Sequence, residues 1–147
     1  MVVTVQEKKA LLKQWIAESN NIVFFGGAGV STESNIPDFR SEKGLYNAQK
    51  EYGHSPEEML SHSFFVRHMK TFYDYYKKNL IYLDAEPNKA HKALAYLEKQ
   101  GKLKAVITQN IDGLHQKAGN EKVFELHGMA KKKLSFTKET KHHYFSF

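Results

Sequence analysis

The chain has 147 residues, of which 41% are hydrophobic, and this length and composition suffice for one domain with a buried core. No apolar run approaches the roughly 18 residues of a transmembrane helix, and the polar N-terminus lacks the apolar block of a secretion signal. The expected location is therefore the cytoplasm. The sequence contains no cysteine, which excludes disulfides and thiolate metal sites.

The net charge of +6 is concentrated near the C-terminus. Residues 129–147 hold five lysines and one glutamate, and three of the lysines, Lys131 to Lys133, are adjacent. A short basic tail is usually only solvated, so the charge argues against a nucleic-acid-binding protein. That alternative predicts salt-dependent binding that disappears when residues 129–147 are deleted.

A helix and a strand are expected first. Thr4 and Glu7 form a capping box, in which each side chain can satisfy a free backbone donor. The helix should end near Asn20 and Asn21, and its apolar residues fall on one face: Leu11, Leu12, Trp15 and Ile16. The run Ile22–Phe25, followed by Gly26, is typical of a strand that is buried on both faces.

The next part of the chain predicts a long loop and a helical insertion. Residues 35–53 are polar and irregular. Ser55, Pro56 and Glu58 then provide a serine cap, a proline at the first helical position and a capping box. An apolar stripe follows, which is more often core than a cofactor site: Phe65, Met69, Phe72, Tyr76 and Leu80.

The pattern from Pro87 onwards predicts an α/β fold with a parallel sheet. A helix is expected over Pro87–Gln100, with Gly101 as its stop and with Ala90, Leu94 and Leu97 facing inward. Strands are expected over 103–108 and 123–126. Ligands of such sheets bind beyond the carboxyl ends of the strands, and three polar segments of this chain begin there.

The first segment, residues 26–32, is a glycine-rich turn of the kind that lets the backbone approach a phosphate. Gly27 and Gly29 fit a G-x-G-x-x-G pattern, but Thr32 stands at the third glycine. No strand ending in an acidic residue follows at the distance that a dehydrogenase requires. A glycine turn without a ligand is the alternative.

An Asp-Phe-Arg sequence lies close behind this turn. Arg40 could pair with a pyrophosphate through its planar guanidinium, and Phe39 could shield a reactive carbon from water. Alternatively, Asp38 and Arg40 form no more than a surface ion pair.

The second segment follows the strand at 103–108. Gln109, Asn110 and Asp112 bring amide and carboxylate groups that suit ribose hydroxyls and a carboxamide. The alternative is an Asx-rich turn, because Asn and Asp favour turns in any case. His115 is expected to be structural.

The third segment, Glu125–Gly128, places His127 at the end of a strand. An imidazole with an ordinary pKa can act as a general base near neutral pH. Because the chain has eight histidines and a lone histidine is more often structural, its residue type alone decides nothing. The adjacent His142 and His143 match no recognised metal motif.

The three motifs together closely resemble the sirtuin family. They read G-A-G-V-S-T-E-S-N-I-P-D-F-R-S, then T-Q-N-I-D-G-L-H-Q, then E-L-H-G, and they occur in the family's order. The similarity extends from the first helix to Gly128 and includes Pro87, Asn88 and His91. It implies a Rossmann-like sheet with flanking helices and an NAD-dependent protein-lysine deacylase.

The resemblance also implies site residues. Gly27, Ala28 and Thr32 would line the phosphate and ribose region of NAD. Phe39 and Arg40 would belong to a cofactor loop. Gln109 would bind the ribose next to nicotinamide, and Asn110, Ile111 and Asp112 would form the nicotinamide pocket. His127 would be the catalytic base.

The implied reaction uses NAD as a substrate. An acyl-lysine carbonyl oxygen attacks the ribose carbon and nicotinamide leaves, after which His127 helps a ribose hydroxyl attack the imidate. Acetylated protein lysines are the implied substrates. Acetyl is favoured as the acyl group, because the stretch from Lys43 to Phe72 has no Ala-x-x-x-x-Tyr-x-x-Arg type of pattern for acidic acyl groups.

The sequence departs from the family after Gly128, where sirtuins continue with two C-x-x-C pairs that bind structural zinc. We therefore expect residues 1–128 to be the N-terminal part of a sirtuin catalytic domain, and residues 129–147 to be an unrelated basic tail. The C-terminal half of the sheet would then be missing. A frameshift or premature stop is favoured over a natural short variant as the cause of the change. The alternative function is an inactive fragment with residual NAD or ADP-ribose binding.

Overall fold

The computed structural model describes residues 4–38 and 49–128. Its elements follow in chain order: α1 (Val5–Glu18), β1 (Ile22–Gly26), the 3₁₀ helix η1 (Ala28–Ser34), α3 (Pro56–Met59), α4 (His62–Arg67), α5 (Met69–Asn79), α6 (Lys89–Lys99), β2 (Leu103–Thr108), α7 (Leu114–Ala118) and β3 (Val123–Glu125). Residues 49–52 are also helical, within the stretch for which an irregular loop is expected. No helix among the described residues is long and apolar enough to cross a membrane.

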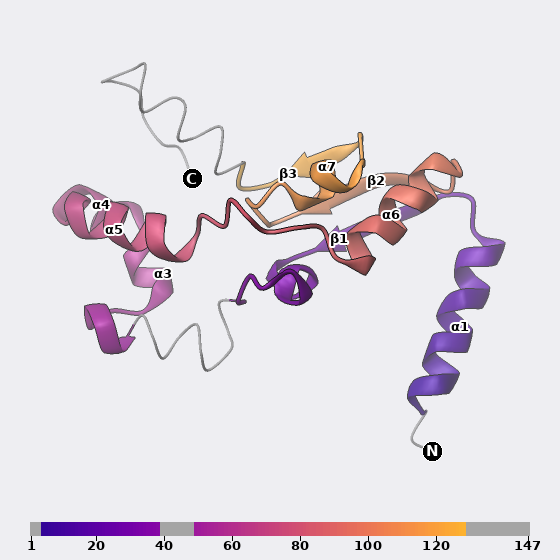
Figure 1. Cartoon of the computed structure of the whole chain (residues 1–147), viewed down its shortest axis with the longest axis horizontal. Coiled ribbons are helices and arrows are strands. Elements are labelled where there is room, and N and C mark those ends of the chain that lie inside the picture. The colour runs from indigo at the N-terminus through magenta and orange to yellow at the C-terminus, as the bar shows by residue number, and fades with distance from the viewer. Residues whose placement is uncertain (1–3, 39–48, 129–147) are drawn as a thin grey trace.

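The three strands form one parallel sheet in the order β1-β2-β3, which confirms the predicted α/β class (Figure 1). Strand β2 lies in the centre, and its Val106 pairs with Phe24 of β1 on one side and with Val123 of β3 on the other. The side chain of Val106 is completely buried. The sheet therefore has its core at the middle of β2.

Helices cover one face of this sheet. Helix α6 packs against β2 and α7, and His115 of α7 contacts the ring of Phe24. On the other face, Val23 is 57% exposed, Phe25 60% and Phe124 59%. The prediction that β1 is buried on both faces is therefore wrong for the described residues, because they place helices over one face only.

Helix α1 begins at the predicted capping box but does not bury its apolar face. Thr4 and Glu7 make both bonds of the box. Trp15 is 56% exposed, and no residue of α1 is buried, because the helix stands apart from the sheet (Figure 1). Its C-terminal end is held by Lys102, whose ammonium donates to the carbonyl oxygens of Ile16, Ala17 and Ser19.

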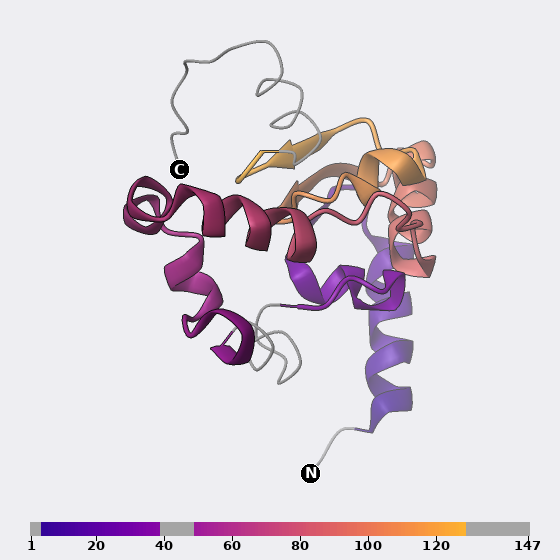
Figure 2. The same cartoon turned by 60° about the vertical axis from the view of Figure 1, so that its left-hand side comes forward.

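The helical insertion contains three short helices where the apolar stripe suggests a single long one. The Ser55 side chain caps α3 as predicted, but Ser61 then accepts from the Phe64 amide and starts α4, and His68 separates α4 from α5. The insertion lies at the end of the molecule opposite α1 (Figure 1), and in the turned view it stands to one side of the sheet (Figure 2). Its buried core consists of Met59, Phe64, Phe72, Tyr75 and Leu80.

Helix α6 faces the core with different residues from those expected. His91 and Ala95 are buried, Leu94 and Leu97 are half-buried, and Ala90 is exposed. Asn88 caps the helix, which therefore begins at Lys89 and not at Pro87. Positions 91 and 95 lie one helical turn apart on the side that packs against α7 and β2. A polar side chain therefore occupies a core position that the apolar pattern cannot identify.

Truncation of Met59 should destabilise the helical insertion. Its side chain is completely buried, so Met59→Ala removes apolar contacts and leaves a cavity, at a cost of about 2–5 kcal/mol in the free energy of unfolding. Urea denaturation followed by circular dichroism measures this. Met69→Ala is the matched control, because Met69 is 53% exposed. Equal midpoints for the two variants would contradict the described core.

Candidate functional site

The loops after the three strands leave the sheet at one edge. The backbone ladder continues past the strands, since the Gln109 amide donates to the Gly26 carbonyl at 3.0 Å and the Leu126 amide donates to the Thr108 carbonyl at 2.9 Å. These two bonds hold the first residues of the loops at the same level. The three polar segments found in the sequence therefore lie together, as the parallel arrangement predicts.

The first loop turns directly into η1. Gly27 has an extended backbone, and a Cβ atom added to it would lie 3.3 Å from Oε1 of Gln109. Glycine thus allows the second loop to approach the first closely. Ala28 is half-buried, whereas Thr32 is exposed and its hydroxyl donates to the Gly29 carbonyl at 3.0 Å.

The Ser31 hydroxyl connects the first and second loops. The residue is completely buried, and its hydroxyl donates to Oδ2 of Asp112 at 2.7 Å. The Ser31 hydroxyl oxygen also accepts a hydrogen bond from Nδ2 of Asn110 at 3.0 Å. Residues about 80 positions apart in the sequence therefore share one hydrogen-bonded cluster, which we call the Ser31 cluster (Ser31, Asn110 and Asp112).

Asp112 has two roles in this cluster. Its Oδ1 accepts from the Leu114 amide at 2.9 Å, while Gly113 between them has φ 72°, a left-handed conformation that favours glycine. This is the Asx turn that the sequence left open as an alternative. The other carboxylate oxygen accepts from the Ser31 hydroxyl, so the same side chain makes the turn and belongs to the Ser31 cluster.

His127 lies beside the second loop. Its Nδ1 is 3.0 Å from the carbonyl oxygen of Gln109. A carbonyl oxygen can only accept, so Nδ1 carries a proton in this hydrogen bond, and in the neutral imidazole the lone pair then lies on Nε2. The side chain is exposed, and its Nε2 is therefore suited to accept a proton from a bound molecule.

Two further histidines lie under this edge of the sheet. His91 and His115 are both at most 1% exposed, and their ring centroids are 4.7 Å apart. Burial lowers the pKa of His115 to about 4, an effect that nearby His91 reinforces and the charge of Asp112 opposes. Burial also lowers the pKa of His91. His115 is thus a core residue, in agreement with the structural role expected for it.

The structure brings together most of the predicted site residues. Gly27, Gln109, Asn110, Asp112 and His127 are joined by the contacts described above. Ile111 instead packs against the core of the helical insertion. Phe39 and Arg40 lie outside the described residues, as does the basic tail at 129–147.

Two residues of the site were not selected from the sequence. Ser31 lies inside the glycine-rich motif, but only its partners in the second loop give it significance. Asn88 precedes α6, and its side-chain amide donates to the Val30 carbonyl at 2.7 Å. The single available signal for Asn88 was its place in the Pro87–His91 stretch.

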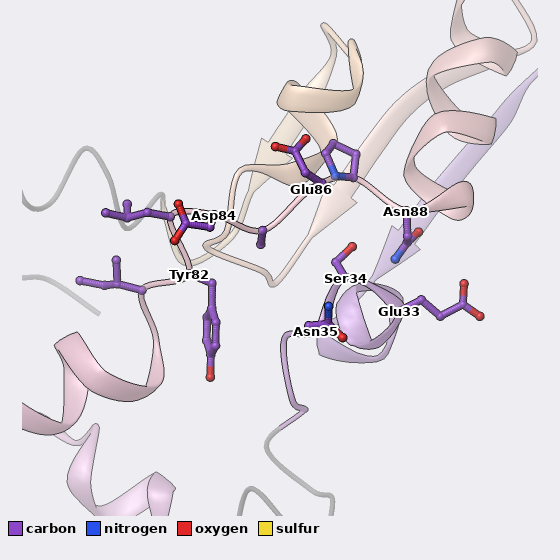
Figure 3. A pocket seen from close by; sticks show the side chains of 11 residues that line it. Glu33, Ser34, Asn35, Tyr82, Asp84, Glu86 and Asn88 are labelled. Carbon is purple, nitrogen blue, oxygen red and sulfur yellow. The ribbon is translucent and has the colours of Figure 1, made fainter.

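A cavity of about 600 Å³ lies between the end of η1 and the segment that connects α5 to α6 (Figure 3). Residues 33–35 and 81–88 line it. The carboxylates of Glu33, Asp84 and Glu86 point in different directions, and Glu86 pairs with Lys117. These acids therefore do not converge on a common charged site.

A family model described as the Sir2 family matches residues 27–144. The chain belongs to the Sir2 family. The match includes all three polar loops and extends into the tail beyond Gly128, for which a separate origin remains a prediction.

Two similar relatives are clostridial proteins. The NAD-dependent protein deacetylase of Clostridium tetani (strain Massachusetts / E88) is 68% identical over 117 residues, which are 80% of this chain and 47% of the relative. The NAD-dependent protein deacetylase of Clostridium acetobutylicum (strain ATCC 824) is 62% identical over 117 residues, 80% of this chain and 48% of that protein. The chain thus spans about half the length of the curated relatives it matches.

Solved Sir2 structures share the fold. One, described as the structural basis for the mechanism and regulation of Sir2 enzymes, is 44% identical with a TM-score of 0.73, over 85% of this chain and 48% of that one. A Sir2 homologue in complex with NAD is 43% identical with a TM-score of 0.70, over 82% and 45% of the two chains. These likenesses confirm the Rossmann-like α/β fold.

Protonation of His115 should destabilise the chain in acid. The unfolded chain takes up this proton near the usual pKa of 6.5, but the folded chain only near 4. The contribution of neutral His115 to the free energy of unfolding is therefore fully present above about pH 6.5. It decreases by roughly 3 kcal/mol as the pH falls to about 4. Urea denaturation at a series of pH values measures this.

His115→Gln should flatten this dependence between pH 6.5 and 4, whereas His62→Gln should not, because His62 is exposed. An unchanged slope in His115→Gln would show that another group causes the acid sensitivity.

Proposed function

We propose that the protein acts as an NAD-dependent protein-lysine deacetylase of the Sir2 family. The main support is the Ser31 cluster together with His127: polar side chains around a buried serine at the carboxyl ends of parallel strands, with an imidazole beside the second loop. In α/β folds a dinucleotide binds at this place. The names of the clostridial relatives and the solved NAD complex agree with this proposal.

The first loop would hold the phosphates and the adjoining ribose. Gly27 gives backbone access, and Ala28 and Thr32 lie on η1 immediately behind it. Gln109, whose side chain approaches Gly27, would bind the ribose that carries nicotinamide. Phe39 and Arg40 complete the proposed cofactor-binding set: Phe39 would screen the ribose carbon and Arg40 would contact NAD.

The second loop would receive nicotinamide. Asn110 and Asp112 offer an amide and a carboxylate, which suit the donors and the acceptor of a carboxamide. Ile111, between them, packs against the core of the helical insertion and would supply an apolar surface for the ring. Ser31 and the Leu114 amide already orient Asp112, so its side chain would lose little conformational entropy on binding.

His127 would be the base of the second chemical step. After the acetyl-lysine oxygen has displaced nicotinamide from the ribose carbon, a ribose hydroxyl attacks the imidate carbon, and Nε2 of His127 accepts its proton. Water then completes the reaction and releases free lysine and acetyl-ADP-ribose. In the neutral imidazole, the hydrogen bond from Nδ1 to the Gln109 carbonyl places the proton on Nδ1 and the lone pair on Nε2, which can then accept the proton.

The proposed substrates are proteins with acetylated lysines. A similar Sir2 structure, 46% identical with a TM-score of 0.70, contains a deacetylated p53 peptide and an acetyl ADP-ribose. A cytoplasmic location is part of the same proposal.

Binding without turnover is the second candidate function. The chain spans 47% of its Clostridium tetani relative, so surfaces contributed by the rest of that protein have no counterpart among the described residues. A chain with an intact Ser31 cluster could still bind NAD or ADP-ribose without releasing nicotinamide.

Nicotinamide release distinguishes the two candidates. The purified chain, given NAD and an acetyl-lysine peptide, should release nicotinamide and form acetyl-ADP-ribose, detected by chromatography. Loss of the base in His127→Ala should decrease acetyl-ADP-ribose formation by about 10²- to 10⁴-fold without loss of ADP-ribose binding. His62→Ala serves as the control, because this exposed histidine lies on α4.

Each result has a defined meaning. Binding of ADP-ribose without product would favour the binding function. If His127→Ala forms acetyl-ADP-ribose at an unchanged rate, His127 is not the base. If the chain binds neither NAD nor ADP-ribose, both candidate functions are wrong.

A further inference from the structure

Asn88 connects two elements that come from distant parts of the sequence. Its Nδ2 donates to the carbonyl oxygen of Val30 at 2.7 Å, across a separation of 58 residues. Figure 3 shows the Asn88 side chain reaching from the start of α6 toward η1. Because Nδ2 is the donor, the other end of the amide, Oδ1, remains available as an acceptor.

The remaining polar groups of Asn88 cap α6. Its Oδ1 accepts from the Ala90 amide at 2.9 Å and from the His91 amide at 3.4 Å. The backbone N–H of Asn88 donates to Nδ1 of His91 at 3.3 Å. One side chain thus stabilises the helix with its oxygen and holds η1 with its nitrogen, and these two effects can be separated by substitution.

The Val30 carbonyl lies at a sensitive position. Val30 immediately precedes Ser31, and its amide donates back to the Gly27 carbonyl at 3.1 Å. A short 3₁₀ helix has poor hydrogen-bond geometry and little stability of its own. Fixing the Val30 carbonyl from outside therefore fixes the backbone that directs the Ser31 hydroxyl at Asp112.

We propose that Asn88 is a positioning residue of the candidate NAD site: its hydrogen bond to Val30 holds η1 so that Ser31 meets Asn110 and Asp112. This inference rests on the proposed function for its role in NAD binding. The effect on η1 itself does not require a ligand. The side chain of Asn88 hydrogen-bonds to Val30, Ala90 and His91, and it acts on the site through Val30 and Ser31.

Asn88→Asp separates the two roles. Aspartate retains the oxygen that caps α6 and is an equally good N-cap residue. It has no N–H to donate, and its carboxylate would face the Val30 carbonyl, so the connection to η1 is lost and replaced by repulsion. Asn88→Ala loses both roles. Asn79→Asp is the matched control, since Nδ2 of Asn79 also donates to a backbone carbonyl, that of Tyr75, but in α5.

Amide hydrogen exchange followed by NMR tests the proposal on the full chain without a ligand. In Asn88→Asp, exchange at the Val30 amide should become about tenfold faster, because η1 loses its external hydrogen bond. Exchange at the Lys92 amide, which donates to the Asn88 carbonyl inside α6, should not change. Asn79→Asp should leave both amides as in the unmodified chain. Unchanged exchange at Val30 in Asn88→Asp, or equal acceleration at Val30 and Lys92, would overturn the proposal.

Calorimetric titration with ADP-ribose tests the consequence for binding. Affinity should fall about tenfold in Asn88→Asp and remain unchanged in Asn79→Asp. Faster exchange at Val30 with unaltered affinity would refute the role in the NAD site. If the unmodified chain binds no ADP-ribose, the proposed function fails, and the exchange data alone decide whether Asn88 holds η1.

Discussion

The parallel pairing of β1, β2 and β3 is the constraint on which the site depends. Parallel strands end at the same edge of a sheet, and two backbone hydrogen bonds past the strand ends, from Gln109 to Gly26 and from Leu126 to Thr108, continue this alignment into the loops. Each loop therefore begins at a fixed level. Side chains that are far apart in the sequence meet without any single loop having to be long.

The polar side chains at this edge satisfy one another's hydrogen-bonding groups. The Ser31 hydroxyl donates once and accepts once, and Asp112 accepts from both Ser31 and the Leu114 amide. The Ser31 hydroxyl is completely buried, and leaving it unpaired would cost more free energy than its hydrogen bonds contribute. Both polar atoms of the Asn88 side-chain amide are also paired: the nitrogen donates to η1 and the oxygen accepts from α6. The orientation of the Ser31 cluster thus depends on how η1 is held by its neighbours.

Local patterns in the sequence predicted the elements well and the burial less well. The capping box at Thr4, the strand at 103–108 and the serine cap at Ser55 are local signals, and the structure contains all three. The exposure of Phe25 could not be predicted, because it depends on which helices cover the sheet. His91 was missed as a core residue because a polar side chain interrupts the apolar pattern.

For the site, too, local patterns predicted the position of the loops but not the contacts between them. Strand ends and motif composition located the three loops, and the resemblance to sirtuins supplied the roles. The partners within the loops required coordinates: the sequence cannot show that Ser31 meets Asp112, or that the Asn88 amide reaches Val30. Both contacts join segments that are tens of residues apart, and only the parallel topology brings them together.

The central claim is that the three loops form one dinucleotide site, and NMR chemical-shift mapping with ADP-ribose tests it most directly. Resonances of the amides at 27–35 and 108–112 and of the His127 ring should shift together, with one common dissociation constant. Shifts confined to a single loop, or spread over α1 and the helical insertion instead, would contradict the account.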